Sequence, residues 1–211
     1  MERLICLLIG YVCGLFETGY FYGKLHHIDI REHGSGNSGA TNTLRTLGKK
    51  AGLIVFLGDA LKCVAAAVIV YFLFRNTKGD MMPLLKMYAG AGAVLGHNYP
   101  FYLKFKGGKG IAATGGLIFA TNIWMAVIAF AIFASVVAVT KYVSVGSLVV
   151  VLVFIAEVVL YGQTGHFQMA QPYLYELYGI AVLLAISAFY KHRANIVRLK
   201  NGTENKIGAK K

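Results

Sequence analysis

Long apolar segments take up most of this chain and restrict it to folds that cross a membrane. Six such segments cover residues 4–22, 51–74, 84–98, 111–140, 143–161 and 173–190. An α-helix needs about 20 apolar residues to span a bilayer core roughly 30 Å thick. Only 14% of the residues are charged, whereas soluble domains average about 25%. The sequence therefore predicts an all-α integral membrane protein, with residues 1–211 forming a single polytopic domain.

The fourth segment, residues 111–140, is too long for one span, because a single helix of that length would extend about 45 Å. A break near Thr121 and Asn122 would turn it into two short helices and raise the total to seven spans. With the N-terminus outside and the C-terminus cytoplasmic, the first polar loop, Lys141 and the basic tail at 200–211 then all face the cytoplasm. The positive-inside rule favours this arrangement over six spans, which would place the tail outside. We also interpret the first segment as a span rather than a signal peptide, because it lacks a small-x-small cleavage site.

Three polar segments rich in glycine or basic residues interrupt the apolar pattern. They read GSGNSGATNTLR at 34–45, KFKGGKG at 104–110 and KHRANIVRLKNGTENK at 191–206. Glycine lets the backbone approach a ligand closely, and successive N–H groups facing one concavity bind anions such as phosphate. In the seven-span topology these segments share one membrane face with the turn at 142–147. The pattern predicts an enzyme that acts on phosphorylated, lipid-like substrates.

Several other functions fit the residues poorly. The net charge of +12 is explained by basic loops and anionic substrates, so we expect no nucleic-acid partner. The GxGxxG pattern at 34–39 follows a membrane helix instead of a strand, which argues against dinucleotide binding. His26, His27 and His33 lack the carboxylate pair or cysteine that would complete a ligand set, so we expect no metal site and no cofactor. A membrane transporter of phosphate or an organic anion is the alternative function.

Taken together, four segments resemble the bacterial acyl-phosphate:glycerol-3-phosphate acyltransferase family. They are GSGNSGATNTLR, GHNYPFYLKFKGGKGIAATGG at 96–116, YVSVGS at 142–147 and HRANIVRLKNGTE at 192–204. GDALK at 58–62 is similar to that family as well, and the resemblance covers nearly the whole chain. Ser38 departs from it, since proline or another apolar residue is expected there, and so does Cys63, where glycine is common.

The resemblance implies a seven-helix membrane enzyme of phospholipid biosynthesis. Such an enzyme transfers a fatty acyl group from acyl phosphate to the 1-hydroxyl of sn-glycerol 3-phosphate, giving lysophosphatidic acid and phosphate. It also implies a multi-pass protein of the bacterial cell (inner or plasma) membrane, with the active site on the cytoplasmic face. The soluble enzyme that makes acyl phosphate is a candidate partner.

Acyl phosphate is an activated mixed anhydride, so the chain needs groups that position the reactants and neutralise phosphate charge. We expect Ser35, Arg45 and His192 to be catalytic, with His192 either accepting the hydroxyl proton or donating to phosphate. A phosphate oxygen of the substrate is the alternative proton acceptor. The expected substrate- and phosphate-binding residues are Gly34, Gly36, Asn37, Asn42, Gly107, Gly108, Lys109, Gly110, Ser144, Asn195 and Arg198.

The remaining polar residues are expected to support the structure. Asp59 and Lys62, three residues apart in an apolar segment, should form an ion pair, because each alone would be costly in the membrane. His97 is expected to anchor the loop that carries Lys109, and Glu204 to brace the basic tail. Asn42 has helix capping as an alternative role. Glu17 and Glu157, also in apolar segments, are expected to pair with buried polar groups.

Overall fold

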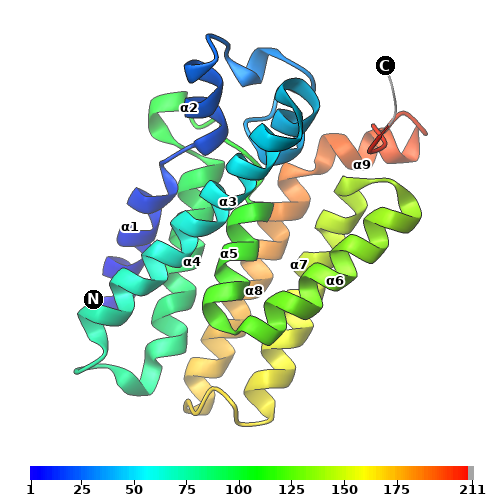
Figure 1. Ribbon diagram of the computed structural model, residues 1–211. Helices are drawn as coiled ribbons and strands as arrows, with labels where there is room; N and C mark the ends of the chain where they lie inside the picture. Colours follow the sequence, from blue (N-terminus) through cyan, green and yellow to red (C-terminus); the bar gives the residue numbers. More distant parts are fainter. Residues whose placement is uncertain (209–211) are drawn as a thin grey trace. The chain divides into compact units, whose positions relative to one another are not determined.

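The computed structural model describes residues 1–208 and is built of α-helices and short 3₁₀ turns (Figure 1). Residues 209–211, the end of the expected basic tail, lie outside the described residues. The chain divides into two compact units, Met1–Thr121 and Asn122–Lys211. Each unit has its own helix packing and its own polar cluster.

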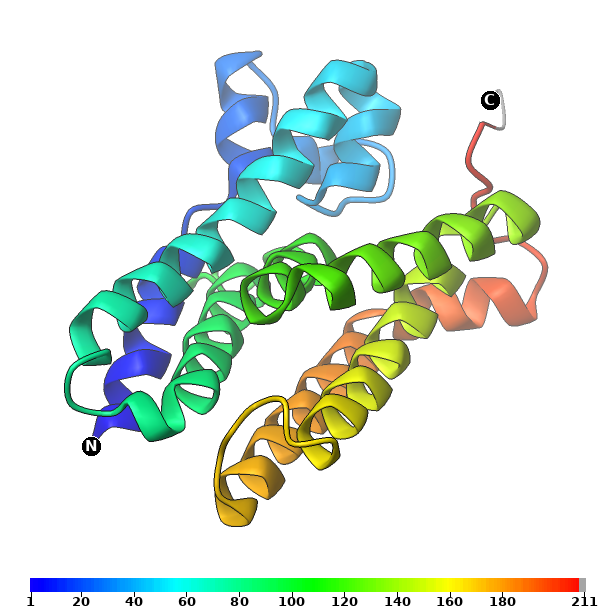
Figure 2. The ribbon, with the colours of Figure 1, turned by 60° about the horizontal axis from the view of Figure 1, so that its bottom comes forward.

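The first unit is a set of helices held together by close backbone contact. Helix α1 lies alongside α4, and α3 packs against α4 and α5 (Figures 1 and 2). Glycines make the α1–α4 contact possible, since a Cβ at Gly10 would collide with the Ala89 backbone and one at Gly92 with the Leu7 carbonyl. The elements of this unit are α1 (Glu2–Gly14), α2 (Thr18–Leu25), η1 (Ile30–Glu32), α3 (Ala40–Phe74), η2 (Gly79–Met81), α4 (Met82–Asn98), η3 (Phe101–Leu103) and α5 (Ile111–Thr121).

The first apolar segment qualifies as a membrane span by length and composition over Glu2–Leu25, as expected at 4–22, but it is not one continuous helix. Helix α1 ends at Gly14 and α2 begins at Thr18, with Glu17 as its N-cap in a non-helical conformation. Side chains bind the carbonyls released by the break: the Tyr102 hydroxyl donates to Leu15 at 2.6 Å, and Lys62 Nζ to Phe16 at 2.8 Å. Because both carbonyls have hydrogen-bond partners, the chain tolerates an interrupted helix here.

Helix α3 begins earlier than the apolar pattern at 51–74 predicts. It starts at Ala40, inside the expected polar loop, and it is interrupted at Gly48. The φ of 88° at Gly48 is outside the helical region, and glycine alone adopts such a φ without a steric penalty. The kink separates a short polar helical segment from the long apolar one.

The second unit starts at the break expected in the segment 111–140. Helix α5 ends at Thr121, and Asn122 is the N-cap of the next helix, its Oδ1 accepting from the N–H groups of Trp124 (2.8 Å) and Met125 (3.3 Å). The predicted break is confirmed, although only α5 is short. The helices of this unit are α6 (Ile123–Thr140), α7 (Val143–Gln163), α8 (Gln171–Lys191) and α9 (Arg193–Lys200).

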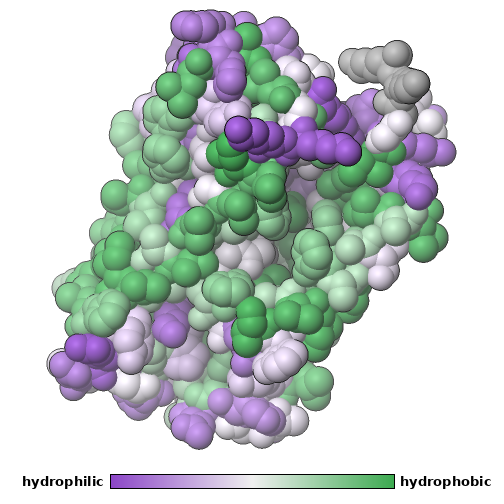
Figure 3. Space-filling model, viewed as in Figure 1, coloured by the Kyte–Doolittle hydropathy of each residue, from purple (hydrophilic) through white to green (hydrophobic). Residues whose placement is uncertain are grey.

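Within the described residues, 5 helical segments are long and apolar enough to cross a membrane: Glu2–Leu25, Ala40–Phe74, Ile123–Thr140, Val143–Gln163 and Gln171–Lys191. In the first unit, hydrophobic residues cover the middle of the helices while hydrophilic ones gather at their ends (Figure 3). The expectation of a multi-spanning membrane protein is therefore confirmed. Helices α4, with 17 residues, and α5, with 11, are shorter than these five.

Candidate active site

The first glycine-rich loop, residues 34–39, is held in shape by the buried amide of Asn42. Its Nδ2 donates to the carbonyls of Ile30 (3.0 Å) and His33 (2.9 Å), and its Oδ1 accepts from the Ser35 N–H (2.7 Å). Both amide protons are thus used by the segment just before the loop. The N-cap of α3 is a glycine, so the alternative role of Asn42 as a helix cap is wrong.

Two of the glycines expected to bind phosphate are required by the shape of this loop. Gly34 and Gly36 have φ values of 59° and 71°, in the left-handed region that favours glycine. A Cβ at Gly34 would also collide with the Asn42 side chain. A substitution at either position would therefore change the loop before it changed any contact with a ligand.

Hydrogen bonds within and beside the loop also reduce the number of backbone N–H groups that could bind phosphate. The N–H groups of Ser35, Gly36 and Gly39 all donate to acceptors within or beside the loop, the last of them to Asn37 Oδ1 at 3.0 Å. The backbone is therefore only partly available to an anion. Ser35 and Arg45 are both exposed residues close to the start of α3.

The second glycine-rich loop, residues 104–110, folds back onto the end of α4. The Gly107 N–H donates to the Asn98 carbonyl at 3.3 Å, and the Gly108 N–H donates to the His97 carbonyl at 3.1 Å. A Cβ at Gly108 would collide with the His97 imidazole. His97 thus contacts the loop through its backbone and its side chain.

Lys109 follows those contacts and is half-exposed. The next residue, Gly110, has a φ of 80°, and a Cβ there would lie 2.8 Å from Asn98 Oδ1. Helix α5 begins immediately afterwards, just as α3 begins after the first loop. Both glycine-rich loops therefore lead into helix N-termini, where exposed N–H groups and the helix dipole favour anions.

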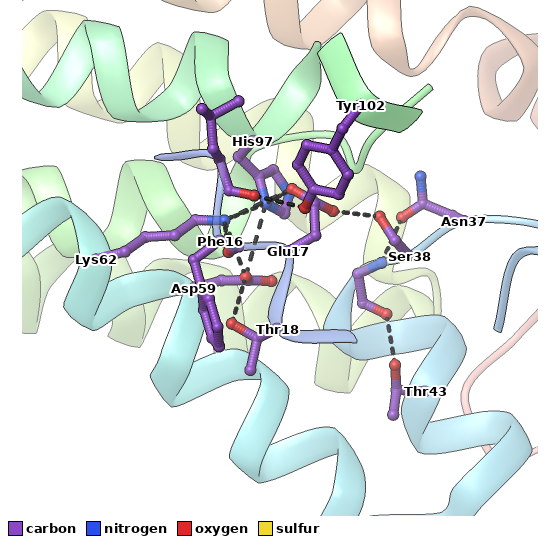
Figure 4. Close-up of polar contacts among 12 residues, drawn as sticks. Phe16, Glu17, Thr18, Asn37, Ser38, Thr43, Asp59, Lys62, His97 and Tyr102 are labelled. Atoms are coloured by element: carbon purple, nitrogen blue, oxygen red, sulfur yellow. Dashed lines mark hydrogen bonds and ion pairs between the residues drawn. The ribbon is translucent and has the colours of Figure 1, made fainter. Parts of the chain in front are cut away.

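Four buried ionisable side chains meet in the first unit: Glu17, Asp59, Lys62 and His97 (Figure 4). Lys62 Nζ lies 3.1 Å from Asp59 Oδ1 and 3.6 Å from Glu17 Oε1. His97 Nδ1 lies 2.8 Å from both Lys62 Nζ and Glu17 Oε1. The expected Asp59–Lys62 ion pair is confirmed, and it is part of a larger buried charge cluster.

The sequence predicted the Asp59–Lys62 pair of this cluster but not its contacts with Glu17 and His97. An ionisable residue inside an apolar segment signals a buried partner, and that signal identifies Glu17 without saying which helix supplies the partner. Glu17 does pair as expected. The same expectation is wrong for Glu157, because neither of its buried carboxylate oxygens has a hydrogen-bond partner within the described residues.

In the second unit, three expected phosphate donors converge on one carboxylate, that of Glu204. Ser144 Oγ (3.1 Å) and Asn195 Nδ2 (2.7 Å) donate to Glu204 Oε1, and Arg198 Nε donates to Oε2 at 2.7 Å. Ser144 lies at the start of α7, and the other two donors share one face of α9. Glu204 thus connects the tail to both helices.

These donors outweigh the effect of burial on Glu204. Burial raises the pKa of the carboxyl, but the hydrogen bonds from Asn195, Arg198 and Ser144 together lower it by more than burial raises it. The pKa of Glu204 therefore lies below its ordinary value. Hydrogen bonds to a carboxylate favour its charged form. The carboxylate is therefore ionised at neutral pH, where it holds the three donors in a fixed arrangement.

His192 is buried at the junction of α8 and α9, and its tautomer follows from one contact. Its Nδ1 lies 2.8 Å from the Ala188 carbonyl oxygen. Because a carbonyl only accepts, Nδ1 must carry a proton, and in the neutral ring Nε2 is then the basic nitrogen. This tautomer can accept a proton through Nε2.

The fold and these groups define a multi-spanning membrane protein with two glycine-rich loops that lead into helix N-termini and a histidine whose Nε2 is the basic nitrogen. A family model described as glycerol-3-phosphate acyltransferase matches residues 4–202. The chain belongs to the glycerol-3-phosphate acyltransferase family and is an acyltransferase. Family membership leaves no support for the alternative of an anion transporter.

Individual relatives match over almost their full lengths. A glycerol-3-phosphate acyltransferase of Clostridioides difficile (strain 630) is 43% identical over 209 residues, covering 99% of this chain and 97% of the relative. One from Shouchella clausii (strain KSM-K16) is 43% identical over 213 residues, covering 100% and 98%. These matches extend across both units of the structure.

Two solved structures of an integral membrane glycerol 3-phosphate acyltransferase, PlsY (YgiH), are similar to this chain. The glycerol 3-phosphate form has a TM-score of 0.85 at 32% identity, covering 99% of this chain and 96% of that one. The lysophosphatidic acid form has a TM-score of 0.81. The similarity therefore extends from sequence to fold.

Proposed function

We propose that this protein transfers a fatty acyl group from acyl phosphate to the 1-hydroxyl of sn-glycerol 3-phosphate, producing lysophosphatidic acid and inorganic phosphate. The observation that carries the proposal is the match of residues 4–202 to a family named for this acceptor. The two glycine-rich loops, each leading into a helix N-terminus, give it chemical support, because the acceptor and the donor both carry phosphate.

The reaction requires positioning more than a strong nucleophile. The acceptor hydroxyl oxygen attacks the acyl carbonyl carbon, an ester bond forms, and the bond from that carbon to the phosphate oxygen breaks as phosphate leaves with the electron pair. Orientation alone can lower such a barrier by about 7–11 kcal/mol, and one oxyanion donor is worth about 10²–10³ in rate. No metal or covalent intermediate is needed for these steps.

The residue roles follow from the chemistry of each group. Ser35 and Arg45 bind phosphate beside the start of α3, and Lys109 supplies a positive charge beside the start of α5. His192 accepts the hydroxyl proton through Nε2, which its Nδ1 contact with Ala188 favours. Asn195 and Arg198, arranged around Glu204, supply further phosphate donors, and Ser144 joins them when its one hydroxyl proton turns from Glu204 to the phosphate.

The membrane arrangement is part of the proposal. Seven spans with the N-terminus outside and the C-terminus inside would place the basic loops and tail at the cytoplasmic face of the bacterial cell membrane. Glycerol 3-phosphate would then reach the site from water and acyl phosphate from the lipid. The basic face would also suit docking of the soluble enzyme that makes acyl phosphate.

Purified protein in lipid vesicles, given acyl phosphate and labelled glycerol 3-phosphate, tests both the function and the residue roles. We expect Ser35→Ala, Arg45→Ala, Lys109→Ala and His192→Ala each to lower kcat/KM by at least about 10-fold, the loss expected from one charge-assisted hydrogen bond. Lys49→Ala, an exposed cation in the same helix as Arg45, is the matched control and should retain activity. Equal, small effects at all five positions would contradict the assignment.

A further inference from the structure

We propose that Glu17 is a positioning residue that ties both glycine-rich loops to the buried charge cluster. The inference rests on the proposed function, because those loops carry Ser35 and Lys109. Glu17 has two carboxylate oxygens, and in the structure each one points toward a different loop (Figure 4).

One oxygen reaches the first loop. Ser38 Oγ donates to Glu17 Oε2 at 2.6 Å, and both residues are buried. A hydroxyl bonded to a carboxylate at this distance is among the stronger hydrogen bonds in proteins. Ser38 directly precedes the N-cap of α3 and lies three residues after Ser35, so this bond fixes the end of the loop that carries Ser35.

The other oxygen reaches the second loop through His97. Glu17 Oε1 lies 2.8 Å from His97 Nδ1. The backbone carbonyl of His97 accepts from the Gly108 N–H at 3.1 Å, and the imidazole contacts Gly108. A shift of Glu17 would therefore be passed through His97 to the residue that precedes Lys109.

Glu17 is itself held on both sides by α3. The carbonyl before it, of Phe16, accepts from Lys62 Nζ at 2.8 Å. The hydroxyl after it, of Thr18, donates to Asp59 Oδ1 at 2.9 Å. Because Asp59 and Lys62 are also ion-paired, the break between α1 and α2 is fixed to α3, and Glu17 has little freedom to move.

The arrangement predicts that loss of Glu17 displaces both loops at once. A misplacement of about 1 Å in groups that position a reactant can cost about 10²-fold in rate. We therefore expect Glu17→Ala to lower kcat/KM by about 100-fold. Glu17→Gln should retain most of the activity, because its amide can donate to Ser38 Oγ while its side chain, of the same length, keeps the contact with His97.

Hydrogen–deuterium exchange of the purified full chain measures this link without substrate. Glu17→Ala should increase exchange in peptides covering 34–39 and 104–110, whereas Ser38→Ala should increase it only in the first. Glu157→Ala is the matched control, since it also removes a glutamate from an apolar segment of the chain, and both loops should exchange as in the wild type. Unchanged exchange at either loop in Glu17→Ala would overturn the proposal.

Glu17→Asp provides a second test should Glu17→Ala fail to fold. It keeps the charge but shortens the side chain by one methylene, so it cannot span both partners. We expect faster exchange at both loops in Glu17→Asp than in Glu17→Gln. The reverse order would mean that the charge at position 17, and not the length of the side chain, holds the loops in place, which would contradict the proposal. Exchange changes as predicted in a protein that makes no lysophosphatidic acid would refute the proposed function while supporting the role of Glu17.

Discussion

At the scale of single residues, polar side chains inside the apolar segments explain where the helices break. Glu17 stands between α1 and α2 because its carboxylate and the neighbouring carbonyl are bonded by other elements. Asn122 stands between α5 and α6 because its side chain caps the second of these helices and donates to the Tyr161 hydroxyl at 3.0 Å. Side chains replace the hydrogen bonds that a continuous helix would have supplied: those of Tyr102 and Lys62 at the first break, and that of Asn122 at the second.

Glu204 gives a pH-dependent prediction. Its pKa is lowered in the folded protein, while an unfolded glutamate titrates at about 4.3. The stabilisation it provides is therefore fully present above the unfolded pKa and is lost as the pH falls through the folded pKa. We expect Glu204→Gln to lower the Tm at pH 7, with a difference from the wild type that shrinks at acidic pH.

Thermal melts of both proteins in detergent, compared at each pH between pH 3 and pH 8, would check this. A difference in Tm that stays constant, or that grows toward acidic pH, would contradict the role assigned to the carboxylate.

At the scale of helices, the contact between α1 and α4 depends on missing side chains. A Cβ at Gly92 would lie 2.8 Å from the Tyr11 backbone nitrogen, closer than packed atoms allow. We expect Gly92→Ala to destabilise the protein by about 1–3 kcal/mol, the usual cost of overpacking. The measurement is the free energy of unfolding in detergent micelles by chemical denaturation.

Gly179→Ala in α8 is the matched control, because a Cβ there meets no atom within 4 Å. It should be neutral or slightly stabilising, since alanine is the better helix former. Equal destabilisation by both substitutions would mean that close approach of α1 and α4 is unimportant.

Helix positions could be predicted well from the sequence, whereas the partners of buried charges could not. The apolar pattern and length located α7, α8 and the break at Asn122 correctly. It missed the break at Glu17, because one ionisable residue in an apolar run predicts a buried partner but does not by itself end a helix. It also found the Asp59–Lys62 pair, which is local, but not its contacts with Glu17 and His97, which depend on how three helices pack.

In the candidate site, too, local features could be predicted from the sequence, whereas contacts that depend on the fold could not. Gly34–Gly36 and Gly107–Gly110 were recognisable as loops because glycine has a strong local meaning. The internal use of the Ser35 N–H by Asn42 was not recognisable, since it depends on the folded loop. The convergence of Ser144, Asn195 and Arg198 on Glu204 likewise depends on the fold, since it brings the start of α7 to the end of the chain.

At the scale of the whole molecule, the proposed topology can be tested by labelling. Seven spans with a cytoplasmic C-terminus predict that a tag after residue 211 is digested by protease added to inside-out membrane vesicles and protected in right-side-out vesicles. A tag on residue 1 should behave in the opposite way. Protection of the C-terminal tag from protease on the cytoplasmic side would contradict the seven-span account.

The most direct test of the central claim is the choice of acyl donor. Purified, folded protein should be given glycerol 3-phosphate with either acyl phosphate or acyl-CoA, and lysophosphatidic acid and released phosphate should be quantified together. We predict product from acyl phosphate, with one phosphate released for each lysophosphatidic acid formed. Product from acyl-CoA alone, or none from either donor, would contradict the account.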